Sequence, residues 1–104
     1  MPGFIQITTT TDSGAAAERI ANELVARRLA GCVQIIGPIQ SLYRWQGAIE
    51  RAEEWLLLIK TAAERYPAVE AAIRELHSYE CPEIIATPIT QGSGAYLKWL
   101  GEQM

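Results

Sequence analysis

The sequence is poor in features that mark several large protein classes. Lys and Arg number 9 against 12 Asp and Glu in 104 residues, a net charge of −3. Function through a general basic surface for nucleic acid is therefore excluded. The longest unbroken apolar run, Trp55 to Ile59, is far shorter than the roughly 18 residues of a membrane span. We expect no nucleic-acid partner and no membrane partner.

Other absences concern processing and catalysis. The start Met1-Pro2-Gly3 lacks the basic and apolar segments of a signal peptide, and 2 cysteines are too few for a disulfide framework, so we expect a cytoplasmic protein. There is no P-loop, no Gly-x-Ser-x-Gly, no Gly-x-Gly-x-x-Gly and no Cys-x-x-Cys. His77 is the only histidine, which excludes a zinc site built on several imidazoles of one chain. Because no base, nucleophile and orienting group are recognisable together, we expect that the protein is not an enzyme.

What is present is a regular alternation of strand-like and helix-like segments. With 49% hydrophobic residues, we expect one domain over 1–104. Asp12 or Ser13 can cap the first helix, and Thr61-x-x-Glu64 has capping-box spacing before a second helix with Pro67 in its first turn. The predicted strands cover 4–9, 32–36, 39–45, 48–61 and 84–89, with Gly37-Pro38 as an interruption, and the predicted helices cover 15–30, a segment holding 68–76, and 95–103.

This order predicts an α+β fold of the ferredoxin-like β-α-β-β-α-β type with a short C-terminal helix. Gln46-Gly47 lies between two strand segments and predicts a hairpin turn. Each arm of this hairpin is longer than ten residues, against about five or six for a typical strand. We expect the hairpin to project beyond the body of the domain.

Both faces of the predicted sheet carry apolar residues. Trp55 to Ile59 is apolar without alternation, and so are the pairs Ile35-Ile36 and Ile84-Ile85. A sheet with one face in water should alternate apolar and polar side chains. We expect two helices to cover one face and identical subunits to cover the other. The alternative is that the C-terminal helix folds back over that face.

The segment from His77 to Glu83 is the densest group of possible metal ligands. His77, Glu80, Cys81 and Glu83 offer an imidazole, a thiol and two carboxylates, which suit copper or zinc. The structural alternative is that His77 ends the second helix and hydrogen-bonds its last carbonyls. A small metal site can also be completed by ligands from a second subunit.

The hairpin is rich in aromatic and charged residues: Tyr43, Arg44, Trp45, Glu50, Glu53, Glu54 and Trp55. One interpretation is cross-strand pairing and contact between subunits, and the other is the wall of a ligand cleft. Cys32 follows Gly31 at the start of a strand, where a small buried hydrophobic residue is the ordinary role.

Several segments together resemble one known family, the CutA divalent-cation tolerance proteins. The resemblance covers nearly the whole chain and implies a ferredoxin-like subunit in a compact homotrimer, similar to the PII signalling proteins. The segments that carry it are Ala30–Ile35, Ser41–Gly47, Glu53–Thr61, His77–Ala86 and Tyr96–Leu100.

The resemblance implies a part in tolerance of copper or another divalent cation, without enzymatic activity. It implies metal ligation by His77, and the family's first-strand cysteine has no counterpart in Thr8 to Thr11, so Cys81 and Glu83 are the further candidate ligands. The likeness to PII proteins implies an alternative, a sensor that binds a small molecule between subunits and signals to a partner protein. The candidate cleft and interface residues are Cys32, Tyr43, Trp45, Glu54, Trp55, Lys60, Tyr79 and Glu80.

Overall fold

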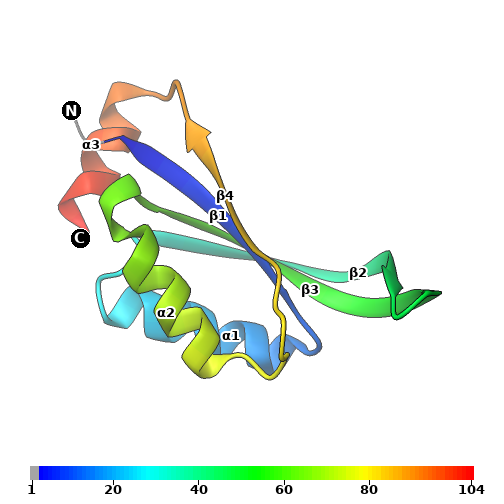
Figure 1. The fold of residues 1–104 in the computed structure, drawn as a ribbon. Helices are drawn as coiled ribbons and strands as arrows, with labels where there is room; N and C mark the ends of the chain where they lie inside the picture. The colour runs from blue at the N-terminus through cyan, green and yellow to red at the C-terminus, as the bar shows by residue number, and fades with distance from the viewer. Residues whose placement is uncertain (1–2) are drawn as a thin grey trace.

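The computed structural model describes residues 3–104 and contains one antiparallel sheet with helices on one side and at one end (Figure 1). The sheet order is β2-β3-β1-β4, as the predicted ferredoxin-like fold requires. No helix among these residues is long and apolar enough to cross a membrane. The elements in chain order are β1 (Phe4–Thr11), α1 (Gly14–Ala26), β2 (Cys32–Trp45), β3 (Ala48–Ala62), the 3₁₀-helix η1 (Ala63–Arg65), α2 (Tyr66–Leu76), β4 (Ile84–Ile89) and α3 (Gly94–Glu102).

Helix α1 begins where the sequence indicates and ends earlier. Ser13 is the N-cap, and its side-chain oxygen accepts from the backbone N–H of Ala16. The predicted end at Ala30 is wrong, because Arg28 adopts a left-handed conformation with φ of 58°. The N–H groups of Leu29 and Ala30 then both bond to the carbonyl of Leu24, which closes the helix.

The hairpin of β2 and β3 is confirmed, with a two-residue turn at Gln46 and Gly47, both at positive φ. The predicted break at Gly37-Pro38 is a bulge inside one continuous strand, since the register shifts between Ile36 and Ile39 and pairing continues on both sides. The distal part of the hairpin extends away from the helices (Figure 1).

The start of α2 differs from the predicted capping box. Thr61 lies inside β3, and its hydroxyl donates to the carbonyl of Leu29 at 2.6 Å instead of capping a helix. The 3₁₀-helix η1 leads into α2, whose N-cap Arg65 makes no side-chain capping bond. Pro67 lies in the first turn of α2, as predicted.

The two faces of the sheet have different surroundings. Helices α1 and α2 pack on one face, where the buried core of the molecule lies. On this face Ile7 of β1 and Leu57 and Ile59 of β3 are fully buried. The core residues from the helices are Ala17, Ile20, Leu24, Val69, Ala72 and Ile73.

The opposite face is apolar and uncovered over most of its area. Leu56 and Leu58 point to this face and are partly buried, whereas Ile36 is 47% exposed and Ile85 54% exposed. Helix α3 covers only one end, where its Gly101 packs near the ring of Phe4. The alternative that the C-terminal helix folds back over the whole face is therefore wrong.

Candidate functional site

The segment between α2 and β4 is held against the end of β1 by both ring nitrogens of His77. Nε2 lies 2.6 Å from the carbonyl oxygen of Thr10, and Nδ1 lies 3.0 Å from the backbone nitrogen of Tyr79. A carbonyl only accepts, so Nε2 carries the proton, and an amide only donates, so Nδ1 is the acceptor. The neutral ring therefore has no nitrogen left for a further partner.

His77 is also the C-cap of α2, and its backbone N–H donates to the carbonyl of Ile73 at 2.8 Å. Its ring does not bond the last carbonyls of α2, as the structural alternative expected, but reaches across to Thr10 of β1. The contact joins residues 67 positions apart in the chain. His77 therefore connects α2, β1 and the segment that follows it.

The metal-ligand set of His77, Cys81 and Glu83 is not formed within one chain. Over residues 3–104, no group of three or more His, Cys, Asp or Glu side chains is placed to hold a metal ion. The physical reason is the orientation of His77, which bonds to β1 while Cys81 and Glu83 line a pocket. The donors of one chain therefore do not fit the copper that the family resemblance implies.

A pocket of about 530 Å³ lies between the β2–β3 hairpin and the segment after α2. It brings together six of the predicted residues, namely Tyr43, Trp45, Glu54, Tyr79, Cys81 and Glu83. The residues that sequence reasoning missed are Thr10, Ser41, Leu42 and Pro82. Ser41 and Leu42 directly precede the predicted Tyr43, and Thr10 lies in the Thr8 to Thr11 segment that corresponds to the family's first-strand cysteine.

Glu54 is the most buried charged residue of this pocket. It is 7% exposed, and its Oε2 accepts a hydrogen bond of 2.9 Å from the hydroxyl of Tyr79. The ion pairs among residues 3–104 involve Arg27 and Arg74, and none includes Glu54. The carboxylate thus has a neutral hydrogen-bond donor but no cation beside it.

Burial and nearby carboxylates both raise the pKa of the Tyr79 hydroxyl. Burial raises the pKa of its hydroxyl above the ordinary 10.0, and the hydrogen bond to Glu54 raises it further. The negative charges of Glu54 and Asp12 act on this pKa in the same direction. Tyr79 therefore keeps its proton and remains a hydrogen-bond donor to Glu54 at physiological pH.

The other predicted cleft residues lie elsewhere. Trp55 is on the helix-covered face, where a Cβ at Gly37 would lie only 2.3 Å from its ring. Cys32 and Lys60 are cross-strand partners near α3, and Lys60 donates to the side chain of Gln34. Successive side chains of a strand point to opposite faces of the sheet, so Trp55 lies on the face opposite to that of its neighbour Glu54.

Glu80 also lies outside the pocket and is exposed. Cys32, Trp55, Lys60 and Glu80 therefore do not line this pocket, and their placement in a ligand cleft between subunits stays a prediction. Their part in contacts between subunits stays a prediction. Cys32 is partly buried, in keeping with the role of a small hydrophobic residue. Burial raises the pKa of the nearby Tyr96 hydroxyl, and the side chain of Cys32 raises it further.

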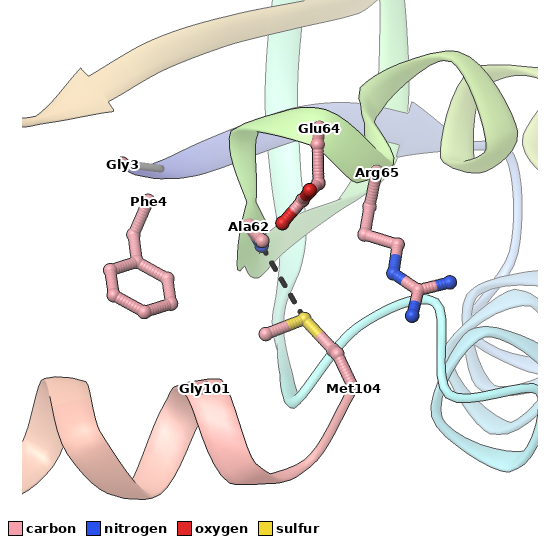
Figure 2. A pocket seen from close by; sticks show the side chains of 7 residues that line it. All are labelled: Gly3, Phe4, Ala62, Glu64, Arg65, Gly101 and Met104. Atoms are coloured by element: carbon pink, nitrogen blue, oxygen red, sulfur yellow. Dashed lines mark hydrogen bonds between the residues drawn. The ribbon is translucent and has the colours of Figure 1, made fainter. Parts of the chain in front are cut away.

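A second pocket of about 480 Å³ lies near the start of β1 and the end of the chain. Figure 2 shows the ring of Phe4, the charged side chains of Glu64 and Arg65, and Met104, whose sulfur accepts from the backbone N–H of Ala62 at 3.4 Å. Its two charged groups have opposite signs. None of the predicted site residues lines it, so the pocket at Glu54 is the better candidate site.

The sheet order and the placement of α1 and α2 define the class of protein as ferredoxin-like α+β. Residues 5–103 match the family model of the CutA1 divalent ion tolerance protein. The chain is 43% identical over 96 residues to the divalent-cation tolerance protein CutA of Thermus thermophilus, covering 92% of this chain and 93% of that one. It is 40% identical to the human protein CutA over 101 residues, which are 96% of this chain but 56% of the human protein. The chain belongs to the CutA1 divalent ion tolerance family.

Solved structures agree with this assignment. The divalent cation tolerance protein of Thermus thermophilus superposes with a TM-score of 0.95 at 40% identity, over 97% of this chain and 98% of that chain. CutA1 from Oryza sativa superposes with a TM-score of 0.96 at 35% identity, over 100% and 94% of the two chains. The structurally similar protein from Archaeoglobus fulgidus is named a periplasmic divalent cation tolerance protein, and the Arabidopsis thaliana relative is named chloroplastic.

Proposed function

We propose that the protein takes part in tolerance of divalent cations as a homotrimer of this chain. The family membership supports the role, and the uncovered apolar face of the sheet is the observation that carries the assembly. Ile36 and Ile85 on this face are exposed, and Leu56 and Leu58 are only partly buried within the chain. Three copies is the number that the family resemblance implies.

The energetic reason is the hydrophobic effect. Full burial of a large aliphatic side chain contributes roughly 1.5–3 kcal/mol. Ile36 and Ile85 are 47% and 54% exposed in the single chain. Covering both would therefore contribute on the order of 2 kcal/mol per subunit, before the rest of the face is counted.

Native mass spectrometry tests the assembly. We expect the wild-type protein to be a trimer and Ile85→Lys to be a monomer, because a charged group at the centre of an apolar interface cannot be desolvated without a partner. Val25→Lys is the matched control, since Val25 is 45% exposed on α1, on the side of the helices. A wild-type monomer at micromolar concentration, or an Ile85→Lys trimer, would contradict the proposal.

We propose that a divalent cation such as copper is bound by the assembly and not by the isolated chain. Cys81 and Glu83 are exposed donors of one chain, and further ligands must come from a second. Addition of one copper ion per chain should add copper mass to the trimer and none to the Ile85→Lys monomer. Cys81→Ser should abolish the uptake, and copper on the monomer would contradict this proposal.

The pocket at Glu54 favours a second candidate function, a PII-like trimer that binds a small molecule and signals to a partner protein. The pocket contains three aromatic rings, and its carboxylates and thiol do not form a group placed to hold a metal ion among residues 3–104. Trp45→Ala should then abolish ligand binding, whereas Trp99→Ala, on α3 and outside this pocket, should not. Equal loss in both variants would contradict this candidate.

We also propose that the protein is cytoplasmic. The proposal rests on the cysteine content of the sequence, because 2 cysteines are too few for the disulfide framework that is common in oxidising compartments. Fractionation of cells that express the full chain tests it. Recovery with the periplasmic fraction would contradict it.

A further inference from the structure

The pocket at Glu54 has an excess of negative charge. Its lining residues include the carboxylates of Glu54 and Glu83 and no Lys or Arg. Asp12 is close enough to Tyr79 to act electrostatically on its hydroxyl. Two carboxylates therefore line this pocket without a basic group among the lining residues, and a cation entering it would be attracted.

Among these carboxylates, Glu54 attracts a cation most strongly, because it is the most buried. A carboxylate removed from water is costly unless a cation or several hydrogen bonds compensate its charge. Glu54 is 7% exposed. Among residues 3–104 the hydroxyl of Tyr79 donates a hydrogen bond to it, but none of the ion pairs includes it. The missing partner is therefore a positive charge.

The aromatic residues decide what kind of cation fits. Tyr43 and Trp45 line the same pocket and are 46% and 50% exposed. The face of an indole or phenol ring attracts a large, weakly hydrated cation such as a substituted ammonium group. A divalent metal ion needs at least three suitable donors, which residues 3–104 do not bring together.

We propose that this pocket binds an organic ammonium cation, with its charge beside Glu54 and its apolar part against Tyr43 and Trp45. The inference rests on the second candidate function, because it names the chemical class of that small molecule. It does not depend on copper uptake, which has its own test. The hydroxyl of Tyr79 fixes the carboxylate of Glu54 in place, so that the site is formed before the cation arrives.

The test compares two probes of the same shape that differ in charge. Choline and its neutral carbon isostere 3,3-dimethyl-1-butanol are titrated into the full-length protein in the millimolar range, with sodium chloride added to keep the ionic strength constant. Binding is followed by NMR through the indole N–H signal of Trp45. We expect choline to shift this signal in a saturable manner and the neutral alcohol not to shift it.

Glu54→Gln identifies the charge that is responsible. The substitution removes the charge but keeps an oxygen that can accept from Tyr79. We expect choline to bind about tenfold more weakly, because the coulombic attraction between the carboxylate and the quaternary ammonium is lost. Glu53→Gln is the matched control, because Glu53 is the neighbouring residue, is exposed and does not line the pocket. It should leave choline binding unchanged.

Three results would overturn the inference. Equal binding of the alcohol and choline would show an apolar pocket without charge selectivity, which leaves the second candidate function standing. Unchanged choline binding in Glu54→Gln would place the cation elsewhere. Absence of choline binding in the wild-type assembly would also overturn it. If Arg44→Ala then restored binding, the basic side chain of Arg44 from a second copy would be what occupies the pocket.

Discussion

Replacement of His77 by alanine removes the ring that joins Thr10 of β1 to Tyr79. Thr10 is 6% exposed, so water has little access to replace the donor that its carbonyl loses at 2.6 Å. The N–H of Tyr79 loses its acceptor at 3.0 Å, and the Tyr79 ring loses a neighbour whose centroid is 4.7 Å away. At about 1 kcal/mol for each hydrogen bond plus the lost packing, we expect a total destabilisation of about 2–3 kcal/mol.

Urea unfolding measures this loss, at one fixed protein concentration because an oligomer's stability depends on concentration. Ser78→Ala is the control, since Ser78 is the exposed neighbour. His77→Gln should recover part of the loss, because its amide group both donates and accepts. The ¹⁵N chemical shifts of the His77 ring should show one protonated nitrogen, Nε2.

A measurement of copper affinity can refute this structural role of His77. Because both ring nitrogens already have partners, His77→Ala should leave copper binding by the assembly within about twofold of wild type. A tenfold or larger loss of copper affinity, together with a change in stability below about 0.5 kcal/mol, would refute the reasoning. It would show that His77 is a metal ligand and that the hydrogen bonds to Thr10 and Tyr79 are unimportant.

Two further predictions concern packing and pH. Gly37→Ala should lower the free energy of unfolding by about 1–3 kcal/mol, because the new Cβ would lie 2.3 Å from the ring of Trp55; Gly94→Ala, whose Cβ meets nothing within 4 Å, should not. The raised pKa of Tyr79 stabilises the fold fully below its ordinary value of 10.0, and this stabilisation is lost as pH rises above it. Tyr79→Phe should therefore show a shallower fall in the free energy of unfolding above pH 10 in alkaline titration, and an equally steep fall would contradict the raised pKa of Tyr79.

Local signals in the sequence predicted the elements that depend on few neighbours. Gln46-Gly47 specified the hairpin turn, Ser13 was one of two predicted caps, and Pro67 indicated the first turn of α2. The errors arose where a distant contact decided the outcome. Thr61 has capping-box spacing, but its hydroxyl bonds to Leu29, and this tertiary contact overrides the local preference.

The residues of the candidate site were predicted only in part, because tertiary contacts also decide which side chains line it. Tyr43, Trp45 and Glu54 were recognisable because aromatic and charged residues are concentrated in the hairpin segments. Trp55 was misplaced because alternation sends it to the face opposite Glu54. Thr10 was not identified as a pocket residue because the Thr8 to Thr11 segment was considered only as the place of a missing cysteine ligand.

The sequence by itself determined the order of elements, the apolar character of both sheet faces and the supply of carboxylates and aromatic rings around the hairpin. These properties follow from composition and periodicity along one strand or helix. Only the tertiary structure decided the partners of individual side chains. It turned His77 toward β1 and away from Cys81 and Glu83, and it buried Glu54 without a cation. Hydrogen bonds and burial depend on atoms brought together from distant parts of the chain, so no local pattern specifies them.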